Sequence, residues 1–233
     1  PRAKDLGPVL VIWFASIGVL VLQRDLGTSI LYFGLFLVLI YTATGRAFYV
    51  GAGVIMMVTG ALVASRLFDY VSRRFDAWLD PFAAENYNAA GGSYQLAQAL
   101  FGFANGDVIG TGLGGGFPQL IPLAESDFIL AALGEELGLA GIFAILAIYL
   151  LLVYRGLRIA NSHPDDFSRL LATGLSFVVG LQVFVVAGGV MGLLPLTGLT
   201  TPFLAAGGSS LIANWAIVAL LLVISDSSLR RQA

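Results

Sequence analysis

The stretch LGLAGIFAILAIYLLLVY, residues 137–154, contains no charged side chain. A helix needs roughly 20 mostly apolar residues to cross the hydrocarbon core of a bilayer, so this stretch predicts a membrane-spanning helix. Backbone polar groups find no water inside a bilayer, and a helix satisfies them within its own segment. Apolar runs that predict further spans occupy residues 7–22, 28–44, 48–65, 170–191 and 209–224.

The composition supports the same class of fold. The chain has 233 residues, of which 58% are hydrophobic and 11% charged, and its mean hydropathy is +0.90. Soluble domains usually carry about 25% charged residues. We therefore expect an all-α integral membrane protein, a polytopic helical bundle with a large extracytoplasmic loop. The net charge of −2 gives no indication of a nucleic-acid partner, and the absence of cysteine excludes disulfides within the chain.

The basic residues predict the orientation in the membrane. Six spans place both ends of the chain on one side, and that side carries eight of the 12 Lys and Arg residues. The positive-inside rule assigns it to the cytoplasm. We expect residues 1–65 to form three spans, residues 66–126 a large outer loop with short interfacial helices, and residues 127–233 an outer-surface segment and three more spans. Because the first residue is Pro1 and not Met, we expect a fragment or a processed product.

Two stretches of the long loop have distinct patterns. SYQLAQALFGFANG (93–106) places Tyr94, Ala97, Leu100 and Phe101 on one helical face, which predicts a short helix on or in the outer leaflet. GDVIGTGLGGGFPQL (106–120) is rich in glycine, which allows the backbone to approach a ligand or a neighbouring helix closely.

Acidic residues cluster in PLAESDFILAALGEELG (122–138), at the edge of a span. One interpretation of Asp127 is structural, because Ser126 or Asp127 could cap the helix that follows. The other is catalytic, because an ionisable residue at a span end that faces a cavity is a functional candidate. Desolvation would raise the pKa of such an aspartate toward the range useful for a general base.

Glu135 and Glu136 also admit two interpretations. Acids in the first turn of a helix complement its dipole, which is a structural role. In an unbroken helix from Asp127, Glu135 would lie about 80° around the axis and ~12 Å along it, too far for a direct carboxylate pair. Gly134 and Gly138 predict a break in that helix.

Arginine and serine residues on the predicted outer side are candidates for binding an anionic ligand. Arg24, Arg73 and Arg74 carry guanidinium groups that match phosphate geometry, although snorkelling to lipid headgroups is the alternative role. Ser209 lies in GGSSL (207–211), where it either caps the last span or exposes a helix N-terminus to an anion. Pro195, Gly198 and Pro202 exclude one continuous helix between the last two spans.

In combination these segments resemble the SEDS family (shape, elongation, division and sporulation). The motifs occur in the family's order along essentially the whole chain: QRDLGTS (23–29), LDPF (79–82), YQLAQAL (94–100), GTGLGGG (110–116), ESDFILAALGEELG (125–138), QVFVVAGGVMGLLPLTGLTTPF (182–203) and GGSSL (207–211). The stretch GGSSLIANW favours the elongation branch over the division branch. The resemblance implies that this chain carries the last six of ten spans, numbers five to ten.

The resemblance also implies a function. Members of the family are peptidoglycan glycosyltransferases that polymerise lipid II, an undecaprenyl-pyrophosphate-linked sugar, outside the bacterial cytoplasmic membrane. Their transpeptidase partner is a class B penicillin-binding protein, and their surroundings are membrane lipids. The family's catalytic aspartate corresponds to Asp127.

The predicted substrate-binding residues are Arg24, Arg73, Arg74, Gln95, Glu135, Glu136 and Ser209. The sequence identifies no certain cofactor, and no metal-ligating residues are predicted. A divalent cation such as Mg²⁺ or Mn²⁺ is one way to stabilise a pyrophosphate leaving group.

Two other functions fit the same features. A lipid II flippase, or another transporter of lipid-linked substrates, would also use broken helices and intramembrane acids. A non-catalytic activator of a penicillin-binding protein would need the fold but not the acid. Transporters favour sites near the membrane midplane, whereas the acids here cluster at one end of the spans, so we expect an enzyme.

Overall fold

The computed structural model describes residues 11, 18, 25–89 and 92–230, and these residues form helices and loops without a strand. The predicted all-α class is therefore confirmed. The elements, in chain order, are α2 (Leu26–Thr44), α3 (Ala47–Leu67), α4 (Asp69–Leu79), α5 (Ala84–Tyr87), α6 (Tyr94–Gly106), the 3₁₀ turn η1 (Pro118–Leu120), α7 (Ile129–Ser162), α8 (Asp166–Val190) and α9 (Gly208–Arg230).

Within the described part of the chain, five helices are long and apolar enough to cross a membrane. They are α2, α3, α7, α8 and α9, and each overlaps one of the spans predicted from hydropathy. The remaining predicted span, residues 7–22, lies almost wholly outside the described residues. The protein is a multi-pass membrane protein.

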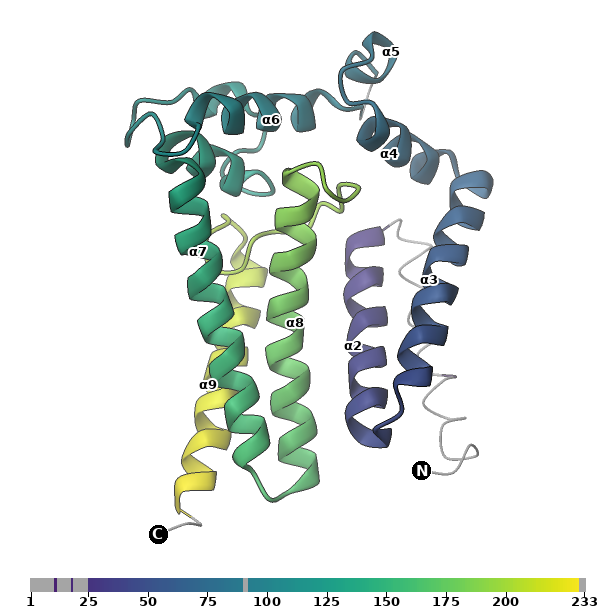
Figure 1. Ribbon diagram of the computed structural model, residues 1–233, viewed down its shortest axis with the longest axis vertical. Coiled ribbons are helices and arrows are strands. Elements are labelled where there is room, and N and C mark those ends of the chain that lie inside the picture. The colour runs from purple at the N-terminus through teal and green to yellow at the C-terminus, as the bar shows by residue number, and fades with distance from the viewer. Residues whose placement is uncertain (1–10, 12–17, 19–24, 90–91, 231–233) are drawn as a thin grey trace.

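Helix α8 lies at the centre of the bundle and packs against α7, α2 and α9 (Figure 1). Small residues allow these helices to approach closely. A side-chain Cβ at Gly156 of α7 would collide with Ser176 of α8, and one at Gly34 of α2 would collide with Leu181 of α8. Close packing of small residues is a major source of helix association in membranes, where the hydrophobic effect between helices is lost.

Residues 68–89 and 92–128 form a cap across one end of the bundle, and we call this end the cap end (Figure 1). Its buried side packs on α7 and α8 through a cluster that includes Ala99, Leu130 and Val186. The cap corresponds to the predicted long loop. The side of the membrane on which it lies stays a prediction.

The predicted short helix in the cap exists and begins at Tyr94 as α6. Tyr94 and Phe101 of the predicted face are exposed, while Ala97 is fully buried. The buried face of α6 consists of small or aliphatic residues, namely Leu96, Ala97, Ala99, Gly102 and Gly106.

The helix directions agree with the predicted distribution of basic residues. The α2–α3 turn, the α7–α8 turn and the end of α9 lie at the end of the bundle opposite the cap (Figure 1). Among the described arginines, Arg46, Arg155, Arg158 and Arg169 belong to the half of the molecule at that end, and Arg66, Arg73 and Arg74 to the cap end.

The predicted break in the helix after Asp127 occurs at Gly138. Its backbone has φ 69° and ψ −174°, whereas Gly134 stays helical. The left-handed φ suits glycine because a side chain would be strained there. The glycine-rich stretch before η1 lies against this break, since a Cβ at Gly138 would collide with the backbone of Gly110. The expected close backbone approach is therefore made to a neighbouring helix.

Candidate functional site

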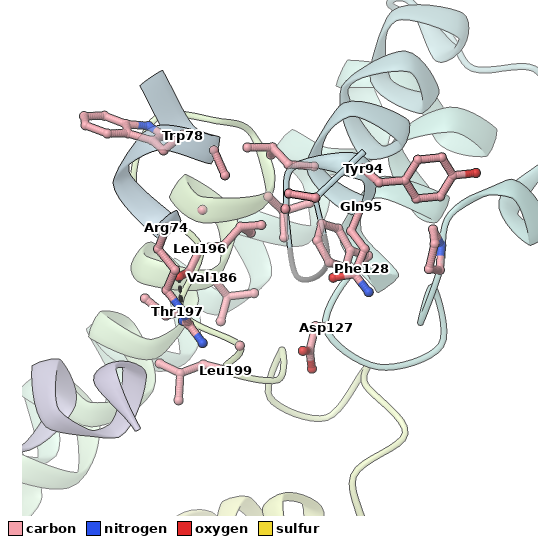
Figure 2. A pocket seen from close by; sticks show the side chains of 18 residues that line it. Arg74, Trp78, Tyr94, Gln95, Asp127, Phe128, Val186, Leu196, Thr197 and Leu199 are labelled. Atoms are coloured by element: carbon pink, nitrogen blue, oxygen red, sulfur yellow. Dashed lines mark hydrogen bonds between the residues drawn. The ribbon is translucent and has the colours of Figure 1, made fainter. Parts of the chain in front are cut away.

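A cavity of about 460 Å³ lies beneath the cap, between α4, the start of α6, the turn before α7 and the end of α8 (Figure 2). Its lining mixes apolar side chains with few polar groups, a composition typical of ligand sites. The residues that line it are Arg74, Ala77, Trp78, Ala89, Gly92, Tyr94, Gln95, Leu96, Pro122, Asp127, Phe128, Val186, Gly189, Val190, Leu196, Thr197, Gly198 and Leu199.

Asp127 is the acidic residue of this lining. It does not cap α7, so the predicted capping role is wrong: Phe128 occupies the N-cap position, and no side chain bonds to the free N–H groups there. Among the described residues, no group donates a hydrogen bond to the Asp127 carboxylate. The carboxylate is therefore available to a ligand in the cavity.

The electrostatic surroundings of Asp127 suit a base. Partial burial raises the pKa of Asp127 above its ordinary value, and the nearby Arg74 guanidinium opposes this by stabilising the carboxylate. An aspartate with a raised pKa is a stronger base than one in water. Perturbed carboxyl groups in clefts are also candidates for functional sites.

Arg74 and Trp78 dock α4 onto the connection between α8 and α9. Arg74 Nη1 donates a hydrogen bond of 2.8 Å to the Leu196 carbonyl, and Trp78 Nε1 donates one of 2.8 Å to the Gly192 carbonyl. The two residues are four apart, so they share one face of α4. Arg74 uses one donor in this contact, and guanidinium has five, so the others remain for a ligand.

The α8–α9 connection folds back into the bundle and forms one wall of the cavity (Figures 1 and 2). Gln182 Nε2 of α8 donates to the Thr200 carbonyl at 2.8 Å, and the Tyr149 hydroxyl of α7 donates to the Pro202 carbonyl. Buried carbonyls at this depth need such partners because water and lipid do not supply them. Side chains from two spans therefore fix the course of the connection.

Gly198 in this connection lies opposite Asp127. It has φ +73°, and a Cβ built on it would be 3.9 Å from Asp127 Oδ2. A second link joins the same two segments, since the Ala206 N–H donates to the Glu125 carbonyl at 2.8 Å. Sequence reasoning identified the Pro-Gly-Pro interruption here but not its contact with Asp127, because the partners are far apart in the chain.

Glu135 and Glu136 are not part of the cavity. Glu135 is 4% exposed, and its Oε1 accepts a hydrogen bond of 2.8 Å from Asn105 Nδ2. Glu136 Oε1 accepts one of 3.2 Å from the Gly114 N–H. In this structure both glutamates hold α6 and the glycine-rich stretch to α7. Their predicted role in substrate binding stays a prediction, without support from this geometry.

The other predicted substrate-binding residues separate into three groups. Arg74 and Gln95 line the cavity. Arg73 is exposed and does not line it, and Ser209 is exposed in the first turn of α9. Because α9 begins at Gly208, Ser209 lies inside the helix and does not occupy its cap. Arg24 lies outside the described residues.

The described residues contain no group of three His, Cys, Asp or Glu side chains that could hold a metal ion. At the cavity the described chain offers one carboxylate, that of Asp127. Mg²⁺ is often bound through one or two carboxylates together with substrate phosphates. The donor set therefore does not form a metal site without phosphate from a ligand.

Comparison with known proteins extends over nearly the whole chain. Residues 1–230 match the model of the FtsW, RodA and SpoVE family, described as cell cycle protein. Among curated relatives, the peptidoglycan glycosyltransferase RodA of Mycobacterium tuberculosis (strain H37Rv) is 49% identical over 230 residues, which are 99% of this chain and 48% of RodA. The probable peptidoglycan glycosyltransferase FtsW of Geobacter metallireducens is 37% identical over 225 residues, which are 96% of this chain and 59% of FtsW.

Solved structures share the fold. A chain of a peptidoglycan synthase complex, described for the structural coordination of polymerization and crosslinking, superposes with a TM-score of 0.78 at 27% identity, over 97% of this chain and 63% of its own length. The crystal structure of a mutant of the Thermus thermophilus rod shape determining protein RodA superposes with a TM-score of 0.63 at 26% identity, over 98% of this chain and 59% of its own. This chain spans about half the length of the mycobacterial relatives that it matches. On the match of residues 1–230, the chain belongs to the FtsW, RodA and SpoVE family, the SEDS proteins.

Proposed function

We propose that the protein to which this chain belongs is a peptidoglycan glycosyltransferase that polymerises lipid II, with Asp127 as its general base. The observation that carries the proposal is the unbonded, partly buried Asp127 carboxylate, which shares a cavity with Arg74. Relatives that are 46–49% identical to this chain are named peptidoglycan glycosyltransferases, which supports the reaction class.

In this mechanism Asp127 removes the proton from the 4-hydroxyl of the GlcNAc residue on the acceptor. The hydroxyl oxygen forms a bond to the anomeric carbon of the donor MurNAc, and the bond from that carbon to the pyrophosphate oxygen breaks. The electron pair leaves with undecaprenyl pyrophosphate, and the proton stays on the Asp127 carboxyl until solvent accepts it. A hydroxyl is a weak nucleophile, so a positioned base typically contributes about 10²–10⁴-fold in rate.

Arg74 is the group we assign to the leaving pyrophosphate. Its guanidinium is fixed by the Leu196 carbonyl and faces the cavity (Figure 2). A preorganised cation stabilises negative charge that develops in the transition state, and the stabilisation is larger where water is excluded. Gln95, which also lines the cavity, supplies an amide that can donate to and accept from sugar hydroxyls.

The decisive experiment is Asp127→Asn in the full-length protein, assayed for lipid II polymerisation in liposomes. We expect the rate to fall by about 10²–10⁴-fold, because the amide has a similar shape and cannot take a proton. Glu125→Gln is the matched control, since Glu125 is an exposed acid two residues away that does not line the cavity. A folded Asp127→Asn protein with near-normal activity would remove Asp127 from this role.

The same liposomes separate the enzyme from the flippase and the activator. Glycan strands formed without any other polymerase are expected of the enzyme. Translocated lipid II without strands would identify a transporter, and neither product in a protein that still stimulates a penicillin-binding protein would identify an activator.

For the partner we propose a class B penicillin-binding protein, which would crosslink the strands. Support comes from the fold shared with a chain of a peptidoglycan synthase complex that coordinates polymerization and crosslinking. We also propose that the cap end faces the extracytoplasmic side of the bacterial cytoplasmic membrane, as the distribution of arginines predicts.

A further inference from the structure

The break in α7 is filled by backbone from another part of the chain. In an unbroken helix the N–H groups of Leu139 and Ala140 would donate to the carbonyls of Glu135 and Glu136. Here the Leu139 and Ala140 N–H groups donate instead to the carbonyls of Asp107 and Val108, at 2.9 and 3.1 Å.

The carbonyls released by the break also find partners in the same segment. Glu135 O accepts from the Thr111 N–H and Glu136 O from the Gly112 N–H, both at 3.0 Å. Residues 107–113, which we call the inserted segment, thus replace two helical hydrogen bonds with four. No side chain fits between the backbones, since a Cβ at Gly110 would collide with the Glu136 carbonyl.

The inserted segment presents large apolar side chains outward. Ile109 is 85% exposed and Leu113 is 81% exposed. On α7, Leu139 and Phe143 are also exposed, and Leu139 bonds the Asp107 carbonyl at the start of the inserted segment. Helix α7 is long and apolar enough to span a membrane, so large exposed apolar side chains beside it suit a lipid environment.

The height of the break in the membrane follows from the opposite end of α7. Tyr154 and Arg155 are exposed there, and the Arg158 guanidinium lies 6.0 Å from the Tyr154 ring centroid, a combination typical of the headgroup level. A hydrocarbon core of about 30 Å corresponds to roughly 20 helical residues. The helix from Gly138 to Arg155 rises by about 26 Å at 1.5 Å per residue, so Gly138 lies near the hydrocarbon boundary at the cap end.

We propose that the inserted segment is a membrane-embedded wedge, whose Ile109 and Leu113 side chains insert among the acyl chains of the leaflet at the cap end. Irregular backbone at that depth is tolerated where protein satisfies its polar groups. Helix α7 does this for the carbonyls of Asp107 and Val108 and for the N–H groups of Thr111 and Gly112. The exposed carboxylate of Asp107 and that of Glu136 lie at the ends of the contact, which places the wedge at the boundary and not at the midplane.

With the wedge inserted, the break at Gly138 does more than change the direction of α7. It anchors the cap to the membrane directly beside the helix that follows Asp127, in addition to the anchoring by α3 and α7 themselves. The inference does not depend on the proposed enzymatic activity, since it concerns a surface outside the cavity.

The test uses variants of the full-length protein in which one cysteine is introduced into this chain, which itself has none, and any cysteine elsewhere in the protein is first replaced by serine. Ile109→Cys and Leu113→Cys carry a nitroxide label in vesicles of phosphatidylethanolamine and phosphatidylglycerol. Power saturation then compares collisions with oxygen, which concentrates in hydrocarbon, and with a water-soluble nickel chelate. Leu150→Cys on the exposed middle of α7 is the lipid control, and Glu85→Cys on α5 is the water control.

We expect the oxygen-to-nickel ratio at both wedge positions to exceed that at Glu85→Cys several-fold and to lie below or near that at Leu150→Cys. A ratio equal to that of the water control would place the segment in solvent and overturn the proposal. Low accessibility to both reagents would show that protein covers the segment, which also overturns it. Both native side chains are largely exposed, so the labels displace no packed neighbour.

Discussion

At the scale of single residues, the site depends on one carboxylate and one guanidinium, and two opposing effects act on the pKa of the carboxylate. Partial burial raises the pKa of Asp127, and Arg74 acts to lower it. A base must be deprotonated to act, so the acid limb of the pH–rate profile reports this pKa.

Replacement of Arg74 by Met is expected to shift that acid limb to higher pH, because the charge that stabilises the Asp127 carboxylate is lost. The measurement is the rate of lipid II polymerisation by the full-length protein as a function of pH. Arg73→Met is the matched comparison: Arg73 is adjacent on α4 but exposed and outside the cavity, so its acid limb should stay in place. Equal shifts in both variants would show that the effect is not specific to the cavity.

Asp127→Asn is expected to stabilise the folded protein at neutral pH. Because the pKa of Asp127 is raised on folding, the folded state binds the proton more tightly than the unfolded state. Ionisation therefore costs stability as the pH rises through the folded pKa, and below the ordinary aspartate pKa the cost disappears. The melting temperature in detergent should exceed that of the wild type at neutral pH, and the difference should shrink at low pH. A destabilised Asp127→Asn protein at neutral pH would contradict this sign.

At the scale of elements, the α8–α9 connection brings its backbone close to the Asp127 carboxylate. Its course is set by Gln182 and Tyr149 from two spans and by Arg74 from the cap. None of these contacts involves neighbours in sequence. The conformation of the α8–α9 connection is therefore set by its packing against distant segments more than by the backbone preferences of its own residues.

Gly198→Ala tests this wall of the cavity against a matched glycine. A left-handed φ costs a non-glycine residue about 1–2 kcal/mol, and Gly198 and Gly192 both have φ +73°. Both alanine variants should lose stability by a similar amount in thermal unfolding. Only Gly198→Ala should also lose polymerisation rate beyond that explained by folding, because its methyl group lies 3.9 Å from Asp127 Oδ2. A comparable loss of rate in Gly192→Ala would show that strain alone is responsible.

At the scale of the whole molecule, the cap and the opposite end of the bundle should lie on different sides of the membrane. The five described spans run between the cap end and the opposite end of the bundle, and the basic residues are unequally distributed between these two ends. If the cap end is extracytoplasmic, the Asp127 cavity opens to the compartment in which peptidoglycan is assembled.

Single cysteines report this orientation in intact cells. Glu85→Cys in the cap should react with a membrane-impermeant maleimide added from outside, whereas Asn161→Cys near the α7–α8 turn should react only after permeabilisation. Both side chains are exposed, so burial does not limit labelling. The reverse pattern would place the cavity on the cytoplasmic side and exclude the proposed reaction.

The sequence alone determined the class of fold, the described spans and the candidate acid. Hydropathy is a local property: each apolar run must satisfy its own backbone in lipid, so its helix can be predicted without its neighbours. The break near Gly138 could also be predicted locally, because glycine weakens a helix. Asp127 was recognisable as an acid at the edge of a span.

Only the tertiary structure decided which groups meet. Arg74 reaches a carbonyl 122 residues away in the chain, and Glu135 bonds Asn105 instead of lining the cavity with Asp127. Arg73 and Arg74 are indistinguishable by composition, but the rotation of α4 about its axis leaves one exposed and brings the other to the cavity. That rotation results from packing between distant segments, and no local pattern encodes it.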